Sequence, residues 1–89
     1  MIKVGLLGAG RIAGVHATAI TANPDSTLAA VSDYSPENAE KLAAQYGSTA
    51  RSTEDIIADP EIDVVLIATS TDTHSDLIEQ ATQAGKAAL

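Results

Sequence analysis

The chain has 89 residues, which leaves room for one small domain and excludes a second. Hydrophobic residues make up 45% of it and charged residues 19%, a balance typical of a globular protein rather than a disordered one. Twelve acidic against five basic residues give a net charge of -7, which opposes binding to nucleic acid and to an anionic membrane surface.

The first third of the chain is predicted to form a strand, a helix and a second strand. Residues 2–7 are an apolar run that ends at glycines, as expected for a strand buried on both faces. A helix is predicted over 11–22. Asn23-Pro24-Asp25 ends it, because proline cannot continue a helix. Residues 27–32 are the second strand. The apolar face of the helix is expected to consist of Ile12, Val15, Ala19 and Ala22.

A second helix is marked by signals at both of its ends. Ser35-Pro36-Glu37 provides a capping residue, a proline at the first helical position and an acid in the first turn. Gly47 provides the stop at the other end. Between these signals the residues expected on the inward face are Ala39, Leu42, Ala43 and Tyr46.

The second half of the chain continues the alternation of strands and helices. The predicted elements are a short strand over 49–51, a helix over 53–58, a strand over 63–69, a helix over 71–84 and the start of a strand over 86–89. The inward face of the last helix is expected to be Leu77, Ile78, Ala81 and Ala84.

Such alternation indicates right-handed crossovers and an α/β fold with a doubly wound parallel sheet, in the Rossmann-like strand order 3-2-1-4-5. The sequence stops as the fifth strand starts. We therefore expect residues 1–89 to be the N-terminal part of a dinucleotide-binding domain in a longer protein, without its substrate domain.

A glycine-rich turn is predicted between the first strand and the first helix. G-A-G-R-I-A at 8–13 matches G-x-G-x-x-G/A in the strand-turn-helix context that a dinucleotide site requires. Gly8 allows the tight turn, Gly10 lets a pyrophosphate approach the backbone, and Ala13 lets the helix pack closely on the strand. Backbone N–H groups at the helix start would hold the phosphates, with Arg11 and Ile12 beside them. Arg11 is equally suited to an exposed helix start.

An acid follows the second strand at the position that contacts ribose in dinucleotide sites. Asp33 stands 20 residues beyond Ala13 and would accept hydrogen bonds from both hydroxyls of the adenosine ribose. A carboxylate repels a ribose 2′-phosphate, and the next residue is Tyr34 rather than Arg, so NAD is favoured over NADP. In the alternative interpretation, the glycines only build a tight turn and Asp33 is a solvated loop acid.

The two histidines do not indicate a metal site. His16 has no second ligand at metal spacing, so a core or helix-surface role is favoured. His74 lies on the inward side of the last helix, where a hydrogen-bonded packing role is the alternative to a site role. The hydroxyl-rich run at 69–73 could cap that helix, but it also follows a strand at the sheet edge where ligands bind. No spacing supports a Ser-His-Asp triad or a carboxylate pair, and no catalytic residue is assigned.

The cellular location is predicted from the absence of certain features. The sequence contains no cysteine, which excludes disulfides and thiolate chemistry and fits a reducing cytoplasm. The apolar start MIKVGLLGAG is too short for a signal peptide, and no run approaches the ~20 residues of a membrane span. We expect a cytoplasmic protein with no membrane partner.

With these motifs assembled, the chain resembles the N-terminal domain of the Gfo/Idh/MocA oxidoreductase family, and within it the inositol 2-dehydrogenases. The matching segments are VGLLGAGRIAGVHA at 4–17, AVSD at 30–33 and IDVVLIATSTDTHSDLI at 62–78. The resemblance implies a Rossmann domain that binds NAD for hydride transfer to or from a cyclitol or sugar. It also implies that Thr69, Ser70 and His74 lie near the nicotinamide half of the cofactor. The family commonly has Pro where this chain has Ser70.

The resemblance places catalysis outside this chain. The family's catalytic Lys, in a Glu-Lys-Pro motif, would directly follow Leu89, and its Asp and His come later, so the chain alone is expected to lack activity. The substrate and often the oligomer contacts belong to a second domain, and a homo-oligomer is expected. Alternatives are a standalone nucleotide-binding or regulatory module, or a truncated product. As an isolated chain, we expect it to self-associate through an open edge at Val64–Ala68 or the Lys86–Leu89 tail.

Overall fold

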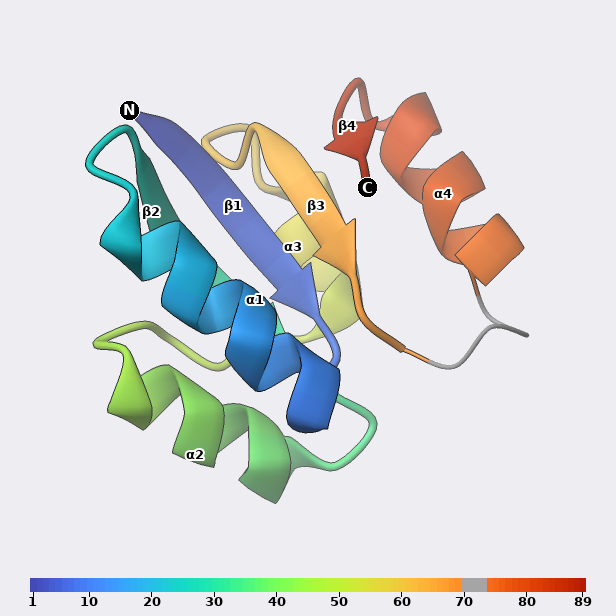
Figure 1. The fold of residues 1–89 in the computed structure, drawn as a ribbon. Helices are drawn as coiled ribbons and strands as arrows, with labels where there is room; N and C mark the ends of the chain where they lie inside the picture. The colour runs from blue at the N-terminus through green and yellow to red at the C-terminus, as the bar shows by residue number, and fades with distance from the viewer. Residues whose placement is uncertain (70–73) are drawn as a thin grey trace.

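The computed structural model describes residues 1–69 and 74–89, and of His74 only the backbone. In this part of the chain, the central strand β1 (Ile2–Leu7) lies between β2 (Ser26–Ser32) and β3 (Val64–Ile67), and β4 (Ala87–Ala88) pairs outside β3 (Figure 1). All three pairings are parallel. Four helices connect the strands: α1 (Arg11–Ala22), α2 (Pro36–Gln45), α3 (Thr53–Ala58) and α4 (His74–Gln83).

The predicted short strand at 49–51 is reduced to a single bridge on the outer edge of β2. Ala50 bridges Val31 in parallel orientation. The Val31 N–H donates to the carbonyl of Thr49 at 2.9 Å, and the Arg51 N–H donates to the carbonyl of Val31 at 2.9 Å. With this bridge counted in chain order, the sheet follows the predicted order 3-2-1-4-5, and the doubly wound α/β fold is confirmed.

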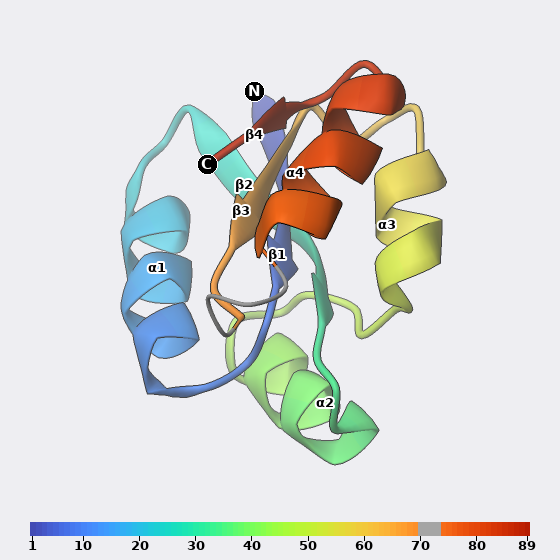
Figure 2. The same ribbon diagram turned by 90° about the vertical axis from the view of Figure 1, so that its right-hand side faces the viewer.

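The helices cover both faces of the sheet. Leu6 and Val31 pack in a core with α1 and α2, whereas Leu7 and Ala30 pack in a second core with α3 and α4. Neighbouring residues of one strand point to opposite faces, so each strand contributes to both cores. Figure 2 shows α1 and α3 on opposite sides of the sheet.

The predicted apolar face of α1 is wrong. Ile12 and Val15 are 64% and 67% exposed, and Ala19 and Ala22 are exposed too. The buried residues of the helix are Ala13 and Ala17. Small side chains allow a helix to approach a sheet closely, so the tight packing selects the alanines rather than the larger residues. This close approach brings the start of α1 directly against the end of β1.

The predictions for the other helices are confirmed in part. The inward face of α2 is confirmed, since Ala39, Leu42 and Ala43 are buried and Tyr46 packs against them. In α4, Ala81 is buried and Leu77 packs on the core, but Ile78 and Ala84 are exposed. A helix at the margin of the sheet contacts it through a narrow stripe only, which leaves the flanking positions outside.

The serine expected to cap α2 does so without its side chain. Ser35 is the N-cap residue and Pro36 follows at the first helical position, but the Ser35 side chain makes no capping hydrogen bond. Its backbone carbonyl instead accepts from the N–H groups of Asn38 at 3.1 Å and Ala39 at 3.2 Å. A serine side-chain cap is found at α3, where Ser52 Oγ accepts from the Asp55 N–H at 3.1 Å.

The outer edge of β3, which was predicted to be mostly open over 64–68, is covered by the edge strand β4. β4 pairs with β3 through Val64–Ala87 and Val65–Ala88. Leu89 extends the pairing, because its N–H donates to the Val65 carbonyl at 3.0 Å and its carbonyl accepts from the Ile67 N–H at 2.8 Å. The outer edge of β3 is therefore paired along most of its length, and the open edge is that of β4.

Buried and paired charges fasten the start of β4. The Lys86 ammonium is buried and donates to the backbone carbonyls of Asp59 and, at 2.9 Å, Ile62. The Asp59 carboxylate in turn pairs with Arg51, with 2.6 Å between Nη1 and Oδ2. Lys86 and Arg51 therefore connect the start of β4, the segment 59–62 and the segment around residue 51. The contacts of Lys86 lie at the amino end of the parallel strands, whereas the glycine turn lies at their carboxyl end.

This pairing predicts a loss of stability in acid. The pKa of Asp59 is lowered from 3.8, first by the hydrogen bond from Arg51 and then by that from the Glu61 N–H. A carboxyl whose pKa is lower in the folded state stabilises the protein above its unfolded pKa, and this contribution is lost as the pH falls through the folded pKa. We expect Asp59→Asn to lower the melting temperature near neutral pH and to melt close to wild type in strong acid.

Thermal unfolding followed by circular dichroism across pH measures the effect. Glu79→Gln is the matched control, because it removes one negative charge at an exposed position of α4. Equal melting temperatures of wild type and Asp59→Asn at neutral pH would show that the ion pair contributes nothing.

Among the described residues, no helix combines the length and apolar character that crossing a bilayer requires.

Candidate functional site

The turn between β1 and α1 is pressed against the end of β3. Gly8 has φ +115°, a backbone conformation that favours glycine. A Cβ added there would lie 2.8 Å from the backbone carbon and oxygen of Ala68 and 3.1 Å from the nitrogen of Thr69. The Gly8 N–H also donates to the Ser32 carbonyl of β2 at 2.7 Å. At this junction of three strands, the backbone conformation of the turn therefore requires glycine at position 8.

Gly10 opens the start of α1 to its surroundings. It is the N-cap residue and has no side chain with which to cap the helix, and the first turn of α1 contains no acid. Apart from its chain neighbours, a Cβ added at Gly10 would meet no atom of the described residues within 4 Å. The first N–H groups of a helix lack intrahelical partners and carry partial positive charge, so this open space suits an anion. Arg11 and Ile12 are exposed at the same helix end, while Ala13 is buried against the sheet.

Asp33 lies at the end of β2 and contacts the glycine turn. Its Oδ1 accepts from the Ala9 N–H at 2.9 Å, and its Oδ2 accepts from the Ser35 N–H at 3.0 Å. The side chain is half-buried. Tyr34, the next residue, is fully exposed.

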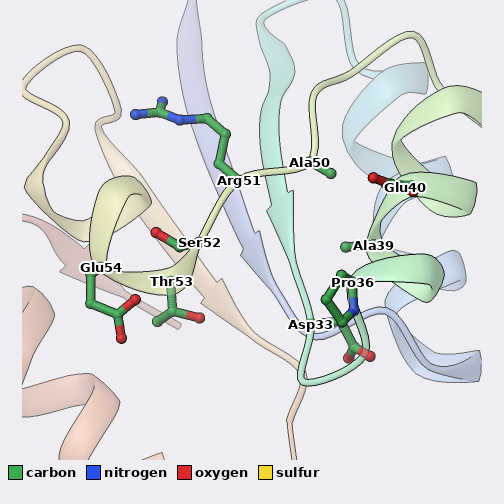
Figure 3. A pocket seen from close by; sticks show the side chains of 9 residues that line it. All are labelled: Asp33, Pro36, Ala39, Glu40, Ala50, Arg51, Ser52, Thr53 and Glu54. Atoms are coloured by element: carbon green, nitrogen blue, oxygen red, sulfur yellow. The ribbon is translucent and has the colours of Figure 1, made fainter.

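A hollow of about 400 Å³ opens beside Asp33, between the start of α2 and the segment 50–54 (Figure 3). Three of its lining side chains are acidic: Asp33, Glu40 and Glu54. Figure 3 shows the guanidinium of Arg51 directed away from Asp33, and that group is paired with Asp59. The negative charge of these three carboxylates therefore disfavours a phosphate group in the hollow, which can accept an uncharged ring.

A smaller hollow of about 260 Å³ lies between the glycine turn and α2. Ala9, Gly10, Arg11 and Gly14 line one side. The other side comes from α2 and contains Asn38 and Lys41, which our sequence reasoning did not single out. No local signal identifies these residues, because only the packing of α2 on α1 brings them to the turn.

A hydroxyl contact holds the two helices together around this hollow. The Tyr46 hydroxyl lies 2.7 Å from Thr18 Oγ1, and Thr18 Oγ1 donates to the Gly14 carbonyl at 2.9 Å. The end of α2 is thereby fixed to the first turns of α1.

The remaining predicted site residues are only partly described. Thr69 follows β3 and lies next to Gly8, so the structure brings it to the glycine turn. Ser70 and the side chain of His74 lie outside the described residues. His16 is half-buried in α1, and in the part of the chain that the structure describes no three His, Cys, Asp or Glu residues are grouped to hold a metal ion.

Comparison with known proteins agrees with this geometry. The profile of a family described as an oxidoreductase family with an NAD-binding Rossmann fold, GFO_IDH_MocA, matches residues 2–89. An inositol 2-dehydrogenase of Rhizobium meliloti (strain 1021) is 51% identical over 86 residues, which cover 97% of this chain and 26% of that protein. The chain thus spans about a quarter of the length of this relative.

Two solved structures are similar to the chain. A myo-inositol dehydrogenase from Corynebacterium glutamicum ATCC 13032 has a TM-score of 0.92 at 39% identity and covers 99% of this chain and 27% of its own. A biliverdin reductase from Synechocystis sp. PCC 6803, in complex with biliverdin and NADP+, has a TM-score of 0.92 at 36% identity. The match covers 98% of this chain and 28% of the reductase. Structures of this kind therefore include proteins that bind NADP+, so the choice between the two cofactors rests on local residues.

Proposed function

Because the chain belongs to the Gfo/Idh/MocA oxidoreductase family, we propose that it is the NAD-binding portion of a dehydrogenase acting on a cyclitol or sugar hydroxyl. The observation that carries the proposal is the open start of α1 at Gly10 with the Asp33 carboxylate beside it. The cyclitol or sugar is inferred from the names of the inositol dehydrogenases to which the chain is similar.

The residues present fit a dinucleotide. The N–H groups at the start of α1 would bind the pyrophosphate, with Arg11 and Ile12 alongside and the Lys41 ammonium adding positive charge. Asp33 would accept hydrogen bonds from the adenosine ribose, and the hollow lined by Ser52 and Thr53 would take the adenine ring.

Bound NAD supplies a nicotinamide ring that accepts or donates a hydride. The contribution of this chain is to bind the cofactor and to orient it. We assign Thr69, Ser70 and His74 to the nicotinamide half, as the family resemblance implies; Thr69 lies where the carboxyl end of β3 meets the glycine turn. Homo-oligomer formation and a cytoplasmic location stay predictions.

We expect the chain to bind NAD about 10- to 100-fold more tightly than NADP. A hydrogen bond to a charged group contributes roughly 1.5–3 kcal/mol, and about 1.4 kcal/mol corresponds to tenfold in affinity. NADP would lose such bonds at Asp33 and would place its 2′-phosphate beside three carboxylates.

Calorimetric titration of the chain with each cofactor at equal ionic strength measures the ratio. Raising the salt concentration is the control, because screening should narrow the gap by weakening the repulsion of the 2′-phosphate. Equal or tighter binding of NADP would contradict the assignment of Asp33, and binding of neither cofactor would contradict the proposed function.

A further inference from the structure

The Asp33 carboxylate connects two backbone segments that are distant in sequence. Oδ1 accepts from the N–H of Ala9, 24 residues earlier, and Oδ2 accepts from the N–H of Ser35. Both hydrogen bonds are partly buried and have lengths of 2.9 and 3.0 Å. Hydrogen bonds from N–H groups to a carboxylate are stronger than those between neutral groups, so both segments are held firmly.

Ala9 is the middle residue of the glycine turn. On one side, Gly8 is fixed by its contact with Ala68 and by its bond to Ser32. On the other side, Gly10 begins α1. Asp33 binds the peptide group between these two points, and therefore determines the direction in which the chain enters the helix.

We propose that Asp33 is a positioning residue for the phosphates of the cofactor as well as a ligand of its ribose. By holding the Ala9 N–H it keeps the glycine turn in the conformation that presents the start of α1 to the pyrophosphate. This inference rests on the proposed function for the identity of the ligand, but it concerns the diphosphate and not the ribose.

The two roles are compatible in one side chain. A carboxylate has about four lone-pair positions, of which Ala9 and Ser35 occupy two. The others remain for the two ribose hydroxyls. The same backbone bonds orient the carboxylate before the cofactor arrives.

The positioning role of Asp33 and its negative charge have opposite effects on the affinity for a diphosphate. A negative charge near the glycine turn repels a diphosphate, so its removal alone would tighten diphosphate binding. If Asp33 also holds the turn, removal of the side chain loosens the turn and weakens diphosphate binding instead. The direction of the change therefore separates the two effects.

The experiment uses 2′,3′-dideoxyadenosine 5′-diphosphate as a probe, because it retains the diphosphate and lacks both ribose hydroxyls. We expect Asp33→Ala to weaken binding of this probe about tenfold, the loss typical of one hydrogen bond to a charged group. Asp33→Asn retains an oxygen for the Ala9 N–H and removes the negative charge, so it should bind the probe at least as tightly as wild type. Glu37→Gln, an exposed charge change in the first turn of α2, is the matched control and should have no effect.

Unchanged or tighter binding of the probe by Asp33→Ala would overturn the positioning role, whatever happens to NAD. If the wild-type chain binds neither NAD nor the probe, the proposed function fails, and amide hydrogen exchange without ligand then decides the positioning role. We expect the Ala9 amide to exchange at least tenfold faster in folded Asp33→Ala and near the wild-type rate in Asp33→Asn. Equal exchange in all three chains would overturn the inference.

Discussion

Replacement of Gly10 by valine is expected to weaken NAD binding at least 100-fold while leaving the chain folded. The backbone at Gly10, with φ -79° and ψ -165°, is extended and accessible to a β-branched residue. Its Cβ would meet no atom within 4 Å in the part of the chain that the structure describes, so the folded state accommodates it. The same space is where we place the pyrophosphate, and loss of two hydrogen bonds at about 1.5 kcal/mol each already amounts to 100-fold.

Calorimetric titration with NAD, together with a thermal melt of the same sample, separates binding from folding. Ala19→Val is the control, since it also places a valine side chain at an exposed position of α1, away from its start. A folded Gly10→Val chain with wild-type affinity would remove Gly10 from the site.

Replacement of Gly8 by alanine is expected to reduce the free energy of unfolding by about 2–6 kcal/mol. The φ of +115° costs about 1–3 kcal/mol for a residue with a Cβ. The added methyl would lie 2.8 Å from the backbone of Ala68, and such overpacking costs about 1–3 kcal/mol more because backbone cannot rotate away. A domain of this size has roughly 4–13 kcal/mol of stability in total, so the variant approaches global unfolding.

Urea denaturation measures this loss against Gly47→Ala. Gly47 has a φ of +67°, but its added Cβ would meet open space, so only the conformational cost of about 1–2 kcal/mol applies. Equal losses at the two positions would mean that the glycine turn moves away from β3 at no cost, contrary to the close contact with Ala68.

Helices whose ends are marked by capping residues, prolines or glycines were predictable from the sequence alone. The helix over 53–58 was predicted with the observed bounds, because Asp59-Pro60 stops it. Gly47 takes positive φ at the predicted stop of the second helix. These features depend on residues a few positions apart, and the energies of caps, prolines and glycines are local. The alternation of elements predicted parallel strands with right-handed crossovers, and the observed strand order is that of a Rossmann-like sheet.

The inward face of α1 and the contacts of the site were decided by tertiary structure. Periodicity identified α1 but not its buried side, because the distance between helix and sheet selects Ala13 and Ala17 over the larger Ile12 and Val15. The type and spacing of Asp33 predicted a ribose ligand, but its bond to Ala9 required β1 and β2 to be paired in register. Lys41 reaches the same site only because α2 packs on α1. Each of these contacts joins segments that are distant in sequence, so its geometry is set by the packing of both cores and by no pattern within either segment.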